Sequence, residues 1–82
     1  MRPNLVQYES AQLATFRAEQ LGIDINDLIH AARNRNATWE ARKPNQQWCS
    51  GYTPGGRRLT VLLEFRSAEL VIIITVNLAE AP

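Results

Sequence analysis

The hydrophobic positions near the start of this chain follow a helical period. Val6, Leu13 and Phe16 fall on one side of a segment that is otherwise rich in Gln, Glu, Ala and Arg, residues that favour a helix. We predict a first helix over residues 5–20. Gly22 follows it and can end it in a left-handed conformation.

A second helix is predicted over residues 25–35. Asp24 is placed to cap it, and Asp27 stands three residues further on, in the manner of a capping box. Asn34 or Asn36 can end this helix in a left-handed turn. Its apolar stripe consists of Ile25, Leu28, Ile29 and Ala32. Together the two segments predict a short helical hairpin.

From Ala37 onward the hydrophobic period changes to two, which is typical of strands. The predicted strands cover residues 37–43, 46–53, 57–66 and 69–77, separated by turns at Pro44-Asn45, Pro54-Gly55-Gly56 and Ser67-Ala68. With two-residue turns at Gly55-Gly56 and Ser67-Ala68, one wholly apolar set would share a face. That set is Leu59, Val61, Leu63, Phe65, Leu70, Ile72, Ile74 and Val76, with Trp39, Trp48 and Tyr52 beside them.

These elements define the expected fold class. We predict an α+β protein in which the N-terminal helical hairpin packs on one face of a four-stranded antiparallel β-meander. The chain has 82 residues, of which 45% are hydrophobic and 21% charged. This is enough for one small folded domain over residues 1–82 and leaves no room for a second.

The sheet face away from the helices is predicted to combine an apolar centre with charged neighbours. Leu62, Val71 and Ile73 form this centre, and we predict that they bind a partner. The charged residues around them are Glu40, Arg42, Arg58, Glu64 and Arg66. Such a surface is typical of an interaction site.

Composition and local patterns narrow the choice of function. A formal net charge of +1 and a pI near 8.0 give no large field, so nucleic-acid binding needs a local cluster of basic residues. The single cysteine, Cys49, is expected to be a packing residue. No signal-peptide pattern is present, and the apolar run Leu70 to Val76 is far shorter than the about 20 residues of a membrane helix. A cytoplasmic protein without a cofactor or metal is expected.

The charged residues suggest one chemistry. Cleavage of RNA without a metal needs a base for the 2′-hydroxyl group and cations that stabilise the phosphate. Glu40 or Glu64 would act as the base, with Arg42, Arg58 and Arg66 as the cations. The alternative interpretation is a set of ordinary cross-strand ion pairs on a solvated sheet.

Other residues are of types that contact nucleic acids. The basic ones are Arg33, Arg35, Lys43 and Arg57, for which charge that serves solubility is the alternative. Trp39, Trp48 and Tyr52 could stack on bases. Their predicted facing, however, places these three aromatic residues in the core.

Two passages carry a resemblance to a known family. They are Gly51-Tyr52-Thr53-Pro54-Gly55-Gly56-Arg57-Arg58-Leu59-Thr60-Val61 and Val71-Ile72-Ile73-Ile74-Thr75-Val76. With the two preceding helices, they resemble the small BrnT-like members of the RelE/ParE toxin superfamily over roughly residues 13–76. The resemblance implies a RelE-like fold and a toxin that cleaves messenger RNA as a metal-independent endoribonuclease. It also implies a cognate antitoxin as partner, and Arg58 matches the family's basic residue after the glycine turn.

Two hypotheses follow for the function. The first is this ribonuclease toxin of a toxin–antitoxin pair, which the clustered arginines and the expected fold favour. The second is a non-catalytic small inhibitor, immunity or phage-encoded protein that docks through its open sheet face on another protein, or on a second copy in a homodimer. Relatives carry a histidine in the stretch matching Ser10-Ala11-Gln12 and a tyrosine or histidine near the last strand. Their absence here favours the second hypothesis. Neither hypothesis involves a membrane.

Overall fold

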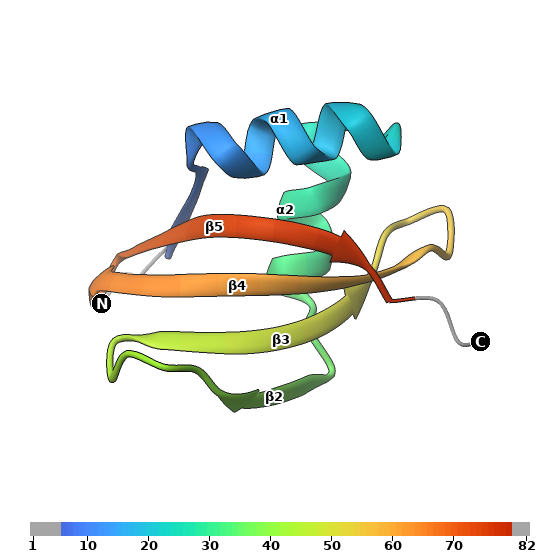
Figure 1. Ribbon diagram of the computed structural model, residues 1–82. Helices are drawn as coiled ribbons and strands as arrows, with labels where there is room; N and C mark the ends of the chain where they lie inside the picture. Colours follow the sequence, from blue (N-terminus) through green and yellow to red (C-terminus); the bar gives the residue numbers. More distant parts are fainter. Residues whose placement is uncertain (1–5, 80–82) are drawn as a thin grey trace, which may run out of the picture.

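The computed structural model describes residues 6–79, which form two helices and five strands. In chain order these are β1 (Gln7–Ser10), α1 (Gln12–Leu21), α2 (Ile25–Arg33), β2 (Ala37–Glu40), β3 (Gln46–Tyr52), β4 (Arg58–Ser67) and β5 (Leu70–Leu78). The two helices lie above and behind the strands in Figure 1, with α1 along β5 and α2 across the back of the sheet. The α+β class is therefore confirmed.

The sheet has five strands, not the four that we predicted, and it is mixed. Its order is β1-β5-β4-β3-β2, and β1 runs parallel to β5 while every other pair is antiparallel. Residues 7–10 were predicted as the start of the first helix, which instead begins at Gln12. The cause is a tertiary contact: the Gln7 amide donates to the Glu69 carbonyl at 2.7 Å and the Ala11 amide to the Ile73 carbonyl at 2.9 Å. Pairing with β5 overrides the local helix preference of this segment.

The ends of the helices follow the sequence closely. Gly22 ends α1 with φ 71°, and the Asp24 carboxylate caps α2 by accepting from the Asn26 amide at 2.8 Å. Asn34 ends α2 with φ −108°, and no residue other than glycine in the described part of the chain has a positive φ. The left-handed turn predicted at Asn34 or Asn36 is therefore wrong.

The packing of α1 differs from the prediction. Its buried residues are Ala14 and Ala18, whereas Leu13 and Phe16 are 54% and 56% exposed. Small side chains allow the helix to lie close to β5, and Arg17 fixes it there by donating to the Asn77 Oδ1 atom at 2.6 Å. The apolar stripe predicted for this helix consequently faces outward in part.

The turn between β3 and β4 is longer than predicted. Tyr52 pairs with Arg58, so residues 53–57 form the loop in place of a two-residue turn at Gly55-Gly56. The Thr53 amide donates to the Arg57 carbonyl at 2.8 Å, and the Gly56 amide donates to the Thr53 carbonyl at 2.9 Å. The register shifts by one residue, which turns every side chain of β3 to the opposite face. Trp48 pairs with Leu62, while Cys49 pairs with Val61 in the core.

The ladder between β4 and β5 also departs from the prediction, although its turn keeps two residues. Ser67 pairs with Leu70, and the ladder carries irregularities between Leu62 and Leu63 and between Phe65 and Ser67. Val71 and Ile73, predicted as partner-binding residues, are therefore 3% and 0% exposed beneath the helices. This is a correction: the one-residue register shifts of these irregularities pair Val71 with Phe65 and Ile73 with Leu63, which places both residues on the covered face.

The core lies between the helices and the covered face of the sheet. Its largest fully buried side chains are Leu28, Val61, Leu59, Leu63, Ile73, Val76 and Cys49. Gly51 is the point where α2 lies directly on β3, because a Cβ atom there would stand 3.0 Å from the Ala31 carbonyl carbon and 3.3 Å from the Arg35 Cα atom.

Candidate functional site

The face of the sheet away from the helices, which we call the open face, carries an aromatic row. Trp39 of β2 pairs with Trp48 of β3, and Trp48 pairs with Leu62 of β4. Tyr52 lies further along β3 on the same face, since side chains alternate along a strand. Trp39 and Tyr52 are 44% and 47% exposed. These aromatic residues were predicted in the core, and the register of β3 instead brings them to the surface.

A hollow of about 350 Å³ lies at one end of this row, beside the β2–β3 turn. Trp48 and Leu62 supply its apolar lining, and Arg42 and Lys43 supply its positive charge. The remaining lining residues are Glu40, Ala41 and Gln46. An aromatic surface next to two cations can hold a planar base together with its phosphate.

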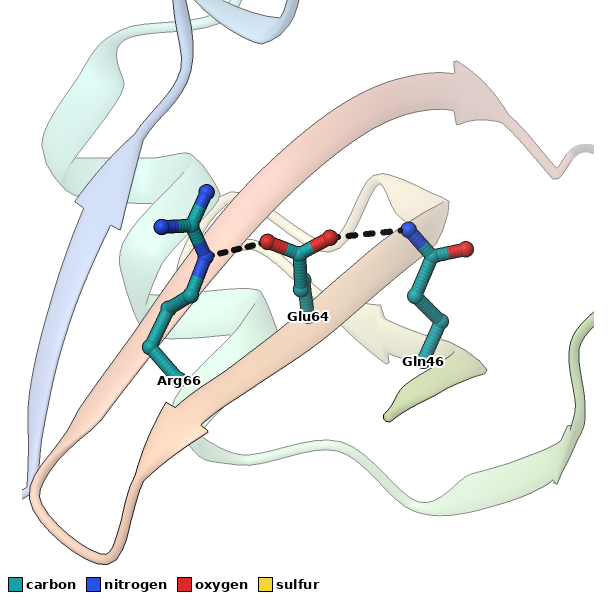
Figure 2. Close-up of polar contacts among 3 residues, drawn as sticks. All are labelled: Gln46, Glu64 and Arg66. Carbon is teal, nitrogen blue, oxygen red and sulfur yellow. Dashed lines mark hydrogen bonds and ion pairs between the residues drawn. The ribbon is translucent and has the colours of Figure 1, made fainter. Parts of the chain in front are cut away.

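Glu64 lies beside this hollow in a defined polar contact (Figure 2). Its carboxylate accepts from the Gln46 Nε2 atom at 3.0 Å and forms an ion pair with the Arg66 Nε atom. The Gln46 and Arg66 hydrogen bonds, together with the nearby charges of Arg66 and Lys43, lower the pKa of the Glu64 carboxyl group. Glu64 is therefore a carboxylate already held by two partners, which weakens it as a general base.

The predicted catalytic residues do not all lie together. Arg58 pairs with Tyr52 at the far end of the open face. Glu40 pairs with Gln47 and alternates with Trp39, which turns it toward the other side of β2. Both Glu40 and Gln47 line a second hollow, of about 470 Å³, at the β2–β3 turn. The structure thus places Glu40 and Arg42 around the same hollows at the β2–β3 turn. Glu64 is linked to this site through Gln46 and to Arg66 through their ion pair, whereas Arg58 lies at the other end of the open face.

The predicted nucleic-acid-binding residues fall in three places. Lys43 lies in the hollow at the β2–β3 turn, whereas Arg33 is the last residue of α2 and Arg35 follows shortly after it. The Arg57 Nη1 atom donates to the Leu21 carbonyl at 3.0 Å and joins the β3–β4 loop to the end of α1. Arg57 therefore has a structural contact, whereas the other three border hollows.

Only Leu62 of the three predicted partner-binding residues is on the open face. Its apolar neighbours there are Trp39, Trp48 and Ile72, since Ile72 pairs with Glu64. A signal for this arrangement is present in the sequence: Cys49 and Gly51 are small, as expected where a helix lies close to a strand. That pattern places the larger Trp48 and Tyr52 on the opposite face.

Cys49 has no role at this surface. It is fully buried, and burial raises the pKa of its thiol to about 11. It remains a neutral packing residue, as expected.

Comparisons of the chain with models of known families, with characterised proteins and with solved structures found no match. Among residues 6–79 there is no group of three or more side chains that could hold a metal ion. No helix in the same part of the chain is long and apolar enough to cross a membrane.

Proposed function

We propose that this protein binds single-stranded RNA through its open face. The observation that carries the proposal is the aromatic row of Trp39, Trp48 and Tyr52 beside the cationic hollow. Stacking on an aromatic ring stabilises a bound base by about 1–3 kcal/mol and requires an unpaired strand. The row therefore favours a single strand over a duplex.

The charges on this face suit a phosphate backbone. Arg42 and Lys43 are exposed beside Trp48, and Arg58 is exposed beside Tyr52, so cations flank the aromatic row at both ends. Arg66 is 57% exposed even though its Nε atom is paired with Glu64, which leaves its other nitrogens open to solvent. Because the protein as a whole carries a charge of only +1, binding depends on these local groups.

Intrinsic fluorescence tests this proposal directly, because both tryptophans of the chain lie on the open face. We expect single-stranded oligonucleotides to quench the emission and duplex RNA of the same length to do so weakly. Trp39→Ala should raise the Kd about tenfold, the loss expected for one stacked base.

Phe16→Ala provides the matched control. Phe16 is also a largely exposed aromatic residue, at 56%, but it lies on α1 on the other side of the sheet. The Kd of this variant should equal that of the wild type. An unchanged Kd in Trp39→Ala, measured by anisotropy of labelled RNA, would contradict the proposal.

Cleavage of the bound RNA is a second candidate function, supported by the ion pair of Glu64 and Arg66, which Gln46 links to the hollow lined by Arg42. As a metal-independent endoribonuclease toxin, the protein would position the scissile phosphate between Arg42 and Arg66. We expect Arg66→Gln to abolish growth inhibition and RNA cleavage, and Arg58→Ala to weaken RNA binding only. Intact RNA and normal growth on induction of the wild type would exclude this function and leave the binding function standing.

The RelE-like assignment belongs to the same proposal. Its support is the pair of helices on one face of the antiparallel strands β2 to β5. The parallel strand β1 is an addition to the arrangement that we expected. A cognate antitoxin would then cover the open face. We expect such a partner to co-purify with this protein and to displace RNA from Trp48.

A further inference from the structure

A third hollow, between β1, the end of α2 and the start of β2, collects hydrogen-bond donors. It has a volume of about 560 Å³ and is lined by Tyr8, Arg33, Arg35, Asn36, Ala37 and Thr38. These residues come from β1, the end of α2 and the start of β2. No carboxylate is among them, so the hollow has two full positive charges that no lining residue neutralises.

Arg35 is held in place within this hollow before any ligand arrives. Its Nη1 atom donates to the Tyr8 hydroxyl oxygen at 2.7 Å and to the Ala32 carbonyl at 2.8 Å. The second contact also satisfies a carbonyl at the negative end of α2. The remaining nitrogens of this half-buried guanidinium stay available as donors.

Three further side chains present donors to the same space. The Tyr8 hydroxyl accepts from Arg35 and keeps its own proton to donate. The Asn36 Oδ1 atom accepts from the Ser50 hydroxyl at 3.2 Å, which leaves the Asn36 amide nitrogen as a donor. Thr38 adds a hydroxyl group. Arg33 lies over the Tyr8 ring, 4.8 Å from its centroid, and this stacking limits its movement.

From this donor set we infer that the hollow binds a phosphate monoester. Several oriented donors and two guanidinium groups, with no competing carboxylate, match the three terminal oxygens of such a group. Two sources carry this chemistry: a free mononucleotide and the 5′ end of an RNA strand. None of the residues that line this hollow belongs to the aromatic row, so the inference does not require RNA to bind to the open face.

The position of the hollow is compatible with either source. Ala37 and Thr38 border it, and the next residue, Trp39, is on the open face of the same edge strand. All four residues of β2 are exposed. A strand bound on the open face can therefore pass over this edge and place its 5′ phosphate in the hollow.

Titration of the isotope-labelled protein with adenosine 5′-monophosphate, followed by amide NMR shifts, tests the inference. We expect shifts at Tyr8, Asn36 and Thr38 that saturate, and none at these positions with adenosine. Arg33→Gln should weaken binding at least about tenfold, since it removes a charged donor. The Arg33 side chain is exposed and donates no hydrogen bond to another side chain or carbonyl within residues 6–79, so this variant should fold, whereas Arg35→Gln would also lose the contact with α2.

Arg17→Gln is the control, because it removes the same charge from α1 at a distance from the hollow. The affinity of the Arg17→Gln variant for adenosine 5′-monophosphate should equal that of the wild type. Trp39→Ala should also keep this affinity, and that result separates the hollow from the RNA-binding surface. Shifts confined to the surroundings of Trp48, or equal weakening in Arg17→Gln and Arg33→Gln, would overturn the inference.

Comparison of 5′-phosphorylated and 5′-hydroxyl RNA distinguishes the two sources. A higher affinity for the phosphorylated strand that disappears in Arg33→Gln would identify the RNA end as the ligand. Equal affinities for the two strands, with nucleotide binding intact, would identify the free nucleotide.

Discussion

Gly51 shows at the scale of a single residue how the sequence positions α2. A Cβ atom at this position would meet the backbone of Ala31 and Arg35, which cannot move without shifting the helix. We expect Gly51→Ala to lower the free energy of unfolding by about 1–3 kcal/mol, the usual range for overpacking. Urea denaturation measures the change.

Gly55→Ala is the matched control for this substitution. The nearest atom to a Cβ at Gly55 is the Thr53 Oγ1 atom at 3.9 Å, an ordinary contact. The stability of this variant should stay within about 0.5 kcal/mol of the wild type. Equal losses in both variants would contradict the close approach of α2 to β3.

Glu64 gives a prediction about pH. Its pKa is lowered in the folded protein, so its contacts stabilise the fold above the unfolded-state pKa of about 4.3, and this contribution is lost as the pH falls through the lower folded value. The difference in melting temperature between wild type and Glu64→Gln should therefore be largest at neutral pH and shrink below about pH 4. Glu19→Gln, an exposed change on α1, controls for the loss of charge. A difference that grows on acidification would contradict the assigned contacts.

At the scale of elements, turns and ladder irregularities decide which face β3 and β5 present. The approximate ranges of β3, β4 and β5 and the facing of β4 could be predicted from the two-residue period, because Leu59, Val61 and Leu63 are buried as expected. The strand predicted over residues 37–43 was too long, since β2 ends at Glu40. The facing of β3 and β5 could not be predicted from that period. For β3 it depends on whether the β3–β4 loop has an even or an odd number of residues, and the backbone hydrogen bonds around Thr53 fix that number. For β5 it depends on the register shifts between Leu62 and Leu63 and between Phe65 and Ser67, which turn Val71 and Ile73 to the covered face. As a result, the residues on the open face include Trp39 and Trp48 in place of the predicted Val71 and Ile73.

The register of β5 leads to a prediction about two neighbouring isoleucines. Ile73 is fully buried in the core, while Ile72 is half-buried on the open face. Ile73→Ala should lower the free energy of unfolding by about 2–5 kcal/mol. Ile72→Ala should lower it by about 1 kcal/mol, since less apolar area is lost. Thermal unfolding of both variants checks the register, and the reverse order would show that β5 is turned over.

At the scale of the whole molecule, β1 joins the two ends of the described chain. No local pattern in residues 7–10 indicates a strand, because the partner that stabilises it lies about 60 residues away in β5. This part of the fold could be found only from the tertiary structure. A four-residue strand with alternating exposure gives too weak a signal beside the helix-forming residues that follow it.

Ala11 allows this junction to be tested. Its amide donates to the Ile73 carbonyl, and its φ of −67° suits proline. Ala11→Pro removes the donor without straining the backbone, and we expect a net loss of about 1 kcal/mol in the free energy of unfolding.

Ala11→Ser is the comparison. It keeps the amide and adds an N-cap side chain, which Ala11 lacks, so it should stabilise the fold by about 0.5–1 kcal/mol. Chemical denaturation of both variants provides the measurement. A stabilised Ala11→Pro variant would show that the link between Ala11 and β5 contributes little.

The pairing of β1 with β5 also sets an order of events during translation. At about 5–20 residues per second, the ribosome needs roughly 3–12 s to proceed from Ser10 to Leu70, and β1 has no partner strand during that time. Tyr8 is carried on β1, so its contact with Arg35 also waits for the last strand. A nascent or prematurely terminated chain therefore contains both arginines but not the finished hollow, and the ability to hold a phosphate would arise only when synthesis has passed β5.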